Sequence, residues 1–121
     1  MKKILIIEDH SDMRELLAWQ IELMGFMSIS AKHGKDGVDK AVAEKPELII
    51  MDIMMPDMDG YDTMRAIRKL AKFRSLPIIA LTAKAMNGDR EKCIEAGASD
   101  YIAKPVDTEQ LLSLLRIWLY R

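Results

Sequence analysis

The run Leu48-Ile49-Ile50-Met51 ends directly on Asp52, near the middle of a 121-residue chain. Four consecutive apolar residues are too few for a core helix, and the lack of alternation with polar residues is typical of a strand covered on both faces. Such strands occur in parallel sheets that carry helices on each side. The run therefore favours an α/β protein in which Asp52 lies at the carboxyl end of a strand.

Similar short apolar runs occur on both sides of it. The five predicted strands are Ile4–Ile7, Phe26–Ser30, Leu48–Met51, Ile78–Leu81 and Tyr101–Ala103. Between them, apolar residues recur at helical spacing from Met13 to Met24, Val38 to Val42, Tyr61 to Ala71 and Met86 to Ile94. A fifth helix is predicted to start at Asp107, with Gln110 as its capping partner. Alternating strands and helices predict a parallel sheet between two helical layers.

The composition limits the classes of partner. With 18 basic and 19 acidic side chains the formal charge is −1, so an electrostatic hold on nucleic acid or on an anionic membrane is not expected. No apolar run approaches the ~20 residues of a membrane span. Cys93 is the only cysteine, which favours a reducing compartment, and it is predicted to lie in the core. We expect one domain over residues 1–121 in the cytoplasm.

Polar residues follow the predicted strands. Glu8 and Asp9 come after the first strand, Asp52 after the third, Thr82 after the fourth and Lys104 after the fifth. Ligands of open parallel sheets bind outside the carboxyl ends of the strands, so these side chains are expected to converge. Carboxylates that crowd together repel unless a cation neutralises them, and oxygen ligands with water suit Mg²⁺. An ammonium, a hydroxyl and Mg²⁺ around one carboxylate form a phosphoryl-transfer site with Asp52 as nucleophile.

These residues belong to longer motifs. They are Glu8-Asp9, Met51-Asp52-Ile53-Met54-Met55-Pro56 with Met58-Asp59-Gly60, Leu81-Thr82-Ala83 and Lys104-Pro105. In this order the motifs resemble the receiver domains of two-component response regulators over the whole chain. The resemblance implies a flavodoxin-like (βα)5 fold, a doubly wound three-layer sandwich with strand order 2-1-3-4-5. The sequence from Leu76 to Arg121 is most similar to receivers of hybrid sensor kinases, whereas the start at Met1 is typical of a free-standing receiver.

The resemblance also implies a role for each site residue. Asp52 is the phospho-acceptor, and Mg²⁺ is held by Glu8, Asp9, Asp52 and the backbone carbonyl of Met54. Thr82 and Lys104 contact the phosphoryl oxygens, and Tyr101 is the switch aromatic, coupled to Thr82. The Lys104-Pro105 bond is expected to be cis, and Met54 and Lys84 are expected to flank the path of a hydrolytic water.

The implied function is a signalling switch that acts on no independent substrate. Asp52 receives its phosphoryl group from a sensor histidine kinase or a histidine phosphotransfer domain, and the phosphorylated domain changes the face formed by the fourth helix, fifth strand and fifth helix. Eight of the ten residues from Leu111 to Tyr120 are apolar, more than one core-facing stripe uses. This excess suggests that the face meets a downstream protein or a second copy.

Other interpretations remain. Asp57-Met58-Asp59-Gly60 resembles the nucleophile motif of haloacid-dehalogenase-type phosphatases, so a small Mg²⁺-dependent phosphatase is the enzyme alternative, although Pro56 separates Asp57 from the strand. An interaction module that works without phosphorylation is the second alternative. Calcium binding is excluded because Met55 and Ala66 would occupy positions that need carboxylates. Asp12, Glu8 and Asp9 can also be acids at a helix start, and His10 lacks a second His or Cys at ligand spacing.

Overall fold

The structure is a computed structural model that describes residues 1–55, 59–83 and 89–120. Strands and helices alternate along the chain, as the sequence predicts. The strands are β1 (Lys3–Ile7), β2 (Met27–Ala31), β3 (Leu48–Asp52), β4 (Ile78–Thr82) and β5 (Asp100–Ala103). The helices are α1 (Ser11–Leu23), α2 (Gly34–Glu44), α3 (Gly60–Lys69), α4 (Asp89–Ala96) and α5 (Thr108–Leu119), and a short 3-10 helix, η1 (Ala71–Phe73), follows α3.

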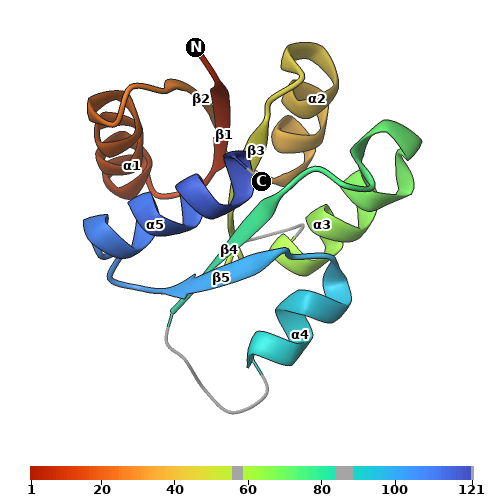
Figure 1. Ribbon diagram of the computed structural model, residues 1–121. Helices are drawn as coiled ribbons and strands as arrows, with labels where there is room; N and C mark the ends of the chain where they lie inside the picture. Colours follow the sequence, from red (N-terminus) through yellow and green to blue (C-terminus); the bar gives the residue numbers. More distant parts are fainter. Residues whose placement is uncertain (56–58, 84–88, 121) are drawn as a thin grey trace.

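The five strands form one parallel sheet in the order β2-β1-β3-β4-β5, which confirms the predicted fold. Every strand therefore ends at the same edge, and the chain returns through a helix to begin the next strand (Figure 1). β3 lies at the centre of the sheet between β1 and β4. Its last residue, Asp52, is thus placed in the middle of the carboxyl edge, where the segments after β1 and β4 can reach it.

Two apolar cores lie on the two faces of the sheet. Leu5 and Ile7 pack with residues of α2, α3 and α4, whereas Ile4 and Ile6 pack with residues of α1 and α5. Figure 1 shows the same division, with α1 and α5 on one side of the sheet and the other helices opposite. All four of these β1 residues are fully buried, and each such side chain contributes about 1.5–3 kcal/mol of hydrophobic stabilisation. Cys93 is buried in the first core, as predicted.

The second strand starts one residue later than predicted. The backbone N–H of Phe26 donates to the carbonyl of Ile21 at 3.1 Å, so Phe26 belongs to the end of α1. Gly25 has a φ of +94°, which turns the chain back over the helix terminus and is accessible to glycine at little cost. β2 therefore begins at Met27. The predicted start of the fourth helix, Met86, lies outside the described residues.

Helix α5 begins after Asp107, as predicted, but the capping bond differs. The Asp107 side chain makes no capping hydrogen bond, and Thr108 Oγ1 instead accepts one from Gln20 Nε2 at 2.8 Å, which joins α5 to α1.

The apolar excess of α5 is smaller than its composition suggests. Leu111 and Leu115 are buried, and Leu114, Trp118 and Leu119 pack against the same core from its rim. Ile117 and Tyr120 remain about half exposed or more. Most of the surplus thus serves the core, and the large apolar side chains that stay exposed are Ile117 in α5 and Tyr120 directly after it.

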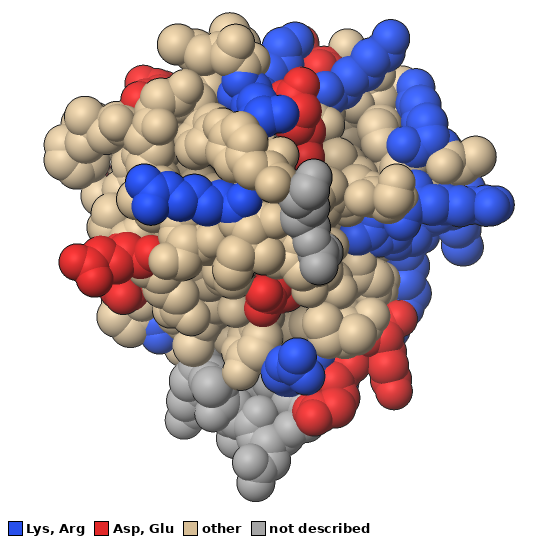
Figure 2. Space-filling view, in the orientation of Figure 1, with Lys and Arg blue, Asp and Glu red and all other residues tan. Residues whose placement is uncertain are grey.

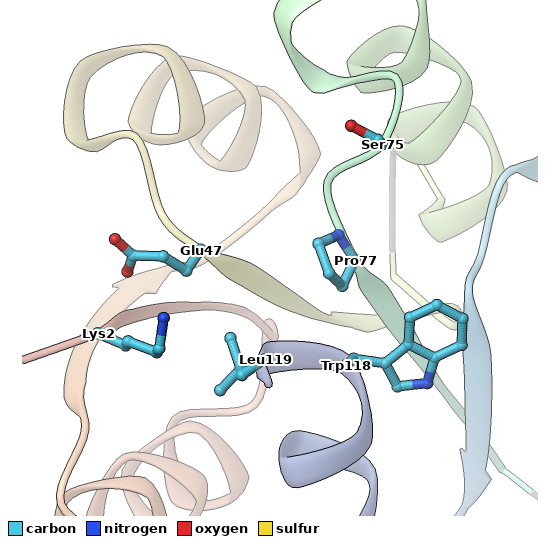
Figure 3. Close-up of a pocket in the computed structure, with 6 residues that line it drawn as sticks. All are labelled: Lys2, Glu47, Ser75, Pro77, Trp118 and Leu119. Atoms are coloured by element: carbon cyan, nitrogen blue, oxygen red, sulfur yellow. The ribbon is translucent and has the colours of Figure 1, made fainter. Parts of the chain in front are cut away.

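The surface charge is unevenly distributed in spite of the small net charge. Figure 2 shows Lys and Arg gathered over α3 and the segment after it, a stretch that contains Arg65, Arg68, Lys69, Lys72 and Arg74. At the amino edge of the sheet lies a hollow of about 370 Å³ that α5 helps to close (Figure 3); it is lined by Lys2, Glu47, Ser75, Pro77, Trp118 and Leu119. None of the described helices is long and apolar enough to span a membrane.

Candidate phosphoryl-transfer site

The predicted acidic residues converge at the carboxyl edge of the sheet. Glu8 follows β1 and is fully buried, Asp52 ends β3 and is 1% exposed, and Asp9 is partly exposed beside them. Together with His10 they can each offer one ligand atom so that all four atoms lie within 4.8 Å of one another. The strand ends thus gather three carboxylates into one small volume.

The backbone around Asp52 is held from both sides. The N–H of Ile53 donates to the carbonyl of Leu81 at 3.0 Å, and the N–H of Gly60 donates to the carbonyl of Ile53 at 3.0 Å. A Cβ at Gly60 would lie 2.5 Å from the Asp52 carbonyl oxygen, so only glycine lets α3 start this close to β3. The Asp59 carboxylate accepts the N–H of Asp62 at 2.9 Å and caps α3. Asp59 therefore has a structural role, and Asp57 lies outside the described residues.

Lys104 reaches into this cluster from β5. Its Nζ lies 3.2 Å from Asp52 Oδ1 and 3.2 Å from Glu8 Oε1, so one ammonium bridges the two buried carboxylates. Its backbone N–H donates to the carbonyl of Thr82 at 2.7 Å, and the Lys104-Pro105 bond is cis, as the resemblance implied. Burial would lower the pKa of Lys104, but the attraction of Asp52 and Glu8 outweighs it and raises that pKa overall. Lys104 is therefore a cation in this site.

Burial raises the pKa of Asp52 to about 7, and the neighbouring Glu8 carboxylate adds to the rise. Lys104 lowers the pKa of Asp52, but by less than burial and Glu8 raise it. The site thus holds more negative charge than one ammonium neutralises. A further cation among these oxygens would favour the ionised form of Asp52.

Three buried oxygens in this region have no hydrogen-bond partner among the described residues: Asp9 Oδ1, Asp52 Oδ2 and Thr82 Oγ1. Unpaired buried polar atoms are costly, and native proteins retain them where a ligand or water completes the site. Two carboxylate oxygens are suitable ligands for Mg²⁺, and a hydroxyl is a suitable donor to a phosphoryl oxygen. The donor set therefore fits both groups that the sequence predicts.

Thr82 and Tyr101 lie on the same face of the sheet but are not adjacent. Thr82 pairs with Ala103, whereas Tyr101 pairs with Ala80, two residues back along β4. Because side chains alternate along a strand, Thr82, Ala80 and Tyr101 point to one face. The sequence interpretation placed Tyr101 at the start of its strand beside Thr82; instead β5 starts at Asp100, and the ring of Tyr101 packs against the first core.

The structure adds two residues that sequence reasoning did not assign. Arg14 Nη1 donates to the carbonyls of Glu8 at 2.9 Å and Asp9 at 3.3 Å, which fixes the loop after β1. His10 Nδ1 lies 3.5 Å from Asp9 Oδ1 and 3.7 Å from Glu8 Oε2. Their closeness in sequence to Glu8 and Asp9 was the available signal. Met54 donates its N–H to Asp52 Oδ1 at 3.3 Å, with its side chain 68% exposed, and Lys84 lies outside the described residues.

Comparison with known proteins agrees with this geometry. The response regulator receiver domain family matches residues 4–116. The chain is 31% identical to the polar-differentiation response regulator DivK of Brucella anthropi over 98% of its own length and 96% of that protein. It is 37% identical to the response regulator ArlR of Staphylococcus aureus over 100% of its own length but only 54% of that protein. The chain therefore spans about half the length of this longer relative.

A solved structure supports the same assignment. The receiver domain of the sensor histidine kinase PA1611 from Pseudomonas aeruginosa has a TM-score of 0.92 to this chain and 35% identity, covering 99% of this chain and 98% of that one. That structure holds a magnesium ion in its active-site cleft. The family match, the strand order and the converging carboxylates agree: the chain belongs to the response regulator receiver domains of two-component signalling.

Proposed function

We propose that Asp52 accepts the phosphoryl group of a phosphohistidine on a sensor histidine kinase or a histidine phosphotransfer domain. The observation that carries this proposal is the state of the Asp52 carboxylate, in which Oδ1 contacts Lys104 at 3.2 Å while buried Oδ2 has no hydrogen-bond partner among the described residues. A bond forms between one oxygen of the Asp52 carboxylate and phosphorus while the phosphorus–nitrogen bond breaks. The electron pair of the broken bond returns to the imidazole of the donor.

The surrounding residues would bind Mg²⁺ and contact the phosphoryl group. Glu8, Asp9, Asp52 and the Met54 carbonyl would hold Mg²⁺, which when bound offsets the negative charge of the phosphoryl oxygens. The Lys104 ammonium, already fixed between Asp52 and Glu8, supports the opposite side of the phosphoryl group. Thr82 is 4% exposed, and its hydroxyl, which has no hydrogen-bond partner among the described residues, would donate to a phosphoryl oxygen.

The output of the switch is proposed to be the face of α4, β5 and α5. Thr82 and Tyr101 share one face of the sheet, so movement of the Thr82 hydroxyl toward the phosphoryl group opens space toward the ring. Asp100, next to Tyr101, accepts a hydrogen bond from Trp118 Nε1 at 3.3 Å, which links β5 to α5. Ile117 and Tyr120 give α5 exposed apolar area for a downstream protein or a second copy. We propose that residues 1–121 form one such domain.

Intact-mass measurement with acetyl phosphate and Mg²⁺ tests the proposal. The wild type and Asp62→Asn, a change on the exposed surface of α3, should each gain one phosphoryl group, whereas Asp52→Asn should gain none because an amide is not a nucleophile toward phosphorus. Equal uptake by all three proteins would contradict the proposal. Continuous release of phosphate from an aryl phosphate with no protein adduct would instead favour the phosphatase alternative.

A further inference from the structure

Two helices of this protein begin after a histidine, and the two side chains behave differently. His33 precedes α2, and its Nδ1 accepts the N–H of Asp36 at 3.2 Å, which caps the helix. His10 precedes α1 with a similarly extended backbone, but its side chain makes no capping hydrogen bond. Its Nδ1 is directed to the carboxylates of Asp9 and Glu8 instead. The orientation of His10 is therefore not explained by helix capping.

The separations around His10 suit two ligands of one ion. Its Nδ1 lies 3.5 Å from Asp9 Oδ1 and 3.7 Å from Glu8 Oε2, too far for a good hydrogen bond. Two ligand atoms bonded to one divalent ion at about 2.1 Å are about 3.0 Å apart at a right angle and about 4.2 Å apart on opposite sides. Both measured separations fall between these limits.

The unpaired Asp52 Oδ2 points to a cation independently of His10. Asp9 Oδ1 and Asp52 Oδ2 are buried without hydrogen-bond partners among the described residues, and the Asp52 side chain is 1% exposed. His10 and these two carboxylates all belong to the group whose ligand atoms lie within 4.8 Å of one another. The cluster thus combines oxygens that lack a hydrogen-bond partner with the imidazole of His10, whose side chain is 74% exposed.

We propose that His10 is an additional metal ligand, so that this site binds a divalent transition ion such as Co²⁺, Ni²⁺ or Zn²⁺ in preference to Mg²⁺. The inference deepens the proposed function because it uses the same carboxylates. Mg²⁺ prefers oxygen and keeps its water, whereas an imidazole nitrogen suits these transition ions. Cys93 is buried in the core, so no thiol competes for them. The ion that occupies the site would then depend on His10.

Calorimetric titration of the phosphate-free protein with Co²⁺ and, separately, with Mg²⁺ tests the inference. His10→Ala should weaken Co²⁺ binding by about tenfold or more and change Mg²⁺ binding by less than about twofold. His33→Ala is the matched control and should change neither. Proton spectra of the Co²⁺-loaded wild type should show one strongly shifted imidazole N–H that His10→Ala loses and His33→Ala keeps.

The outcomes separate this inference from the proposed function. Equal changes in the binding of both ions in His10→Ala, or a shifted imidazole signal that depends on His33, would overturn the proposed role of His10 without contradicting Mg²⁺ binding by the wild type. Failure of the wild type to bind either ion would overturn the metal site as a whole, and with it the proposed chemistry at Asp52. Co²⁺ binding that Asp9→Ala leaves unchanged would show that the ion sits elsewhere, and would also overturn the inference.

Discussion

The guanidinium of Arg68 donates two hydrogen bonds to the carbonyl of Gly97, at 2.9 Å from Nε and 2.7 Å from Nη2. Its Nη1 donates to the carbonyls of Phe73 at 2.7 Å and Leu76 at 2.6 Å. Arg68 therefore joins α3 to the end of α4 and to the segment that leads into β4. Burial lowers the pKa of Arg68.

This contact predicts unequal effects of alanine at two glycines with positive φ. Gly97→Ala should destabilise the protein by about 1–3 kcal/mol more than Gly25→Ala, because it adds overpacking to the backbone strain that both changes share. A Cβ at Gly97 would lie 2.7 Å from Arg68 Cγ, whereas one at Gly25 meets nothing within 4 Å. Urea unfolding measures the difference. Equal losses of unfolding free energy in the two variants would contradict this prediction, because they would mean that the Arg68 side chain shifts without cost.

Substitution by valine is expected to change protein stability differently at the two buried threonines near the site. Thr82 Oγ1 has no hydrogen-bond partner among the described residues, whereas Thr63 Oγ1 donates to the carbonyl of Asp59 at 2.8 Å. Thr63→Val should cost about 0.5–1.5 kcal/mol, because the Asp59 carbonyl keeps the Thr63 N–H as a donor, and Thr82→Val should be neutral or stabilising in the unphosphorylated protein. Thermal unfolding compares them. A large loss in Thr82→Val would show that its hydroxyl is already bonded.

The pKa of Asp52 predicts a pH-dependent stability in the metal-free protein. Because the folded pKa of about 7 exceeds the ordinary value of 3.8, the stabilising contribution of protonated Asp52 is fully present below pH 3.8, declines above it and is lost as the pH rises through 7. Asp52→Asn does not titrate, so its stability relative to wild type should rise between pH 4 and 8, by up to about 4 kcal/mol. Urea unfolding with a chelator present measures this. A difference independent of pH would contradict the raised pKa.

The apolar side chain of Met54 is expected to lengthen the lifetime of the phosphorylated state. Its side chain is 68% exposed two residues after Asp52, where an apolar group excludes water without activating it. Met54→Asn should therefore accelerate loss of the phosphoryl group severalfold, and Met27→Asn, at the amino end of β2, should not. Phosphate release after removal of the phosphodonor measures both rates. An unchanged or slower decay in Met54→Asn would contradict this role.

Much of the architecture could be predicted because it rests on local patterns. Continuous apolar runs identify buried parallel strands, and the carboxyl-end rule then brings Glu8, Asp52 and Thr82 together without any knowledge of contacts. Strand ends were less predictable. Phe26 is apolar enough to start β2, but its N–H is bound by the end of α1, and no local pattern encodes that bond.

The features that depend on distant contacts could not be predicted. Arg68 is a charged residue at helical spacing, and only the fold shows that it bonds the carbonyl of Gly97, 29 residues away. The carboxyl-end rule did predict that Lys104 joins the cluster, but not that its ammonium bridges Glu8 and Asp52 at equal distances from beyond β4. His10 and His33 both precede helices in the sequence, and only the structure distinguishes a cap from a side chain that faces the acidic cluster.

Chemical mapping of the phosphorylated residue tests the central claim most directly. Borohydride reduces an acyl phosphate of aspartate to homoserine, and peptide mass spectrometry then locates the changed residue. After phosphorylation with acetyl phosphate and Mg²⁺, homoserine should appear at position 52 alone, because Asp52 is the one buried carboxylate within residues 1–55, 59–83 and 89–120 that combines an unpaired oxygen with the Lys104 ammonium. Homoserine at Asp9 or Asp57, or no homoserine in a protein that carries the phosphoryl mass, would contradict the account.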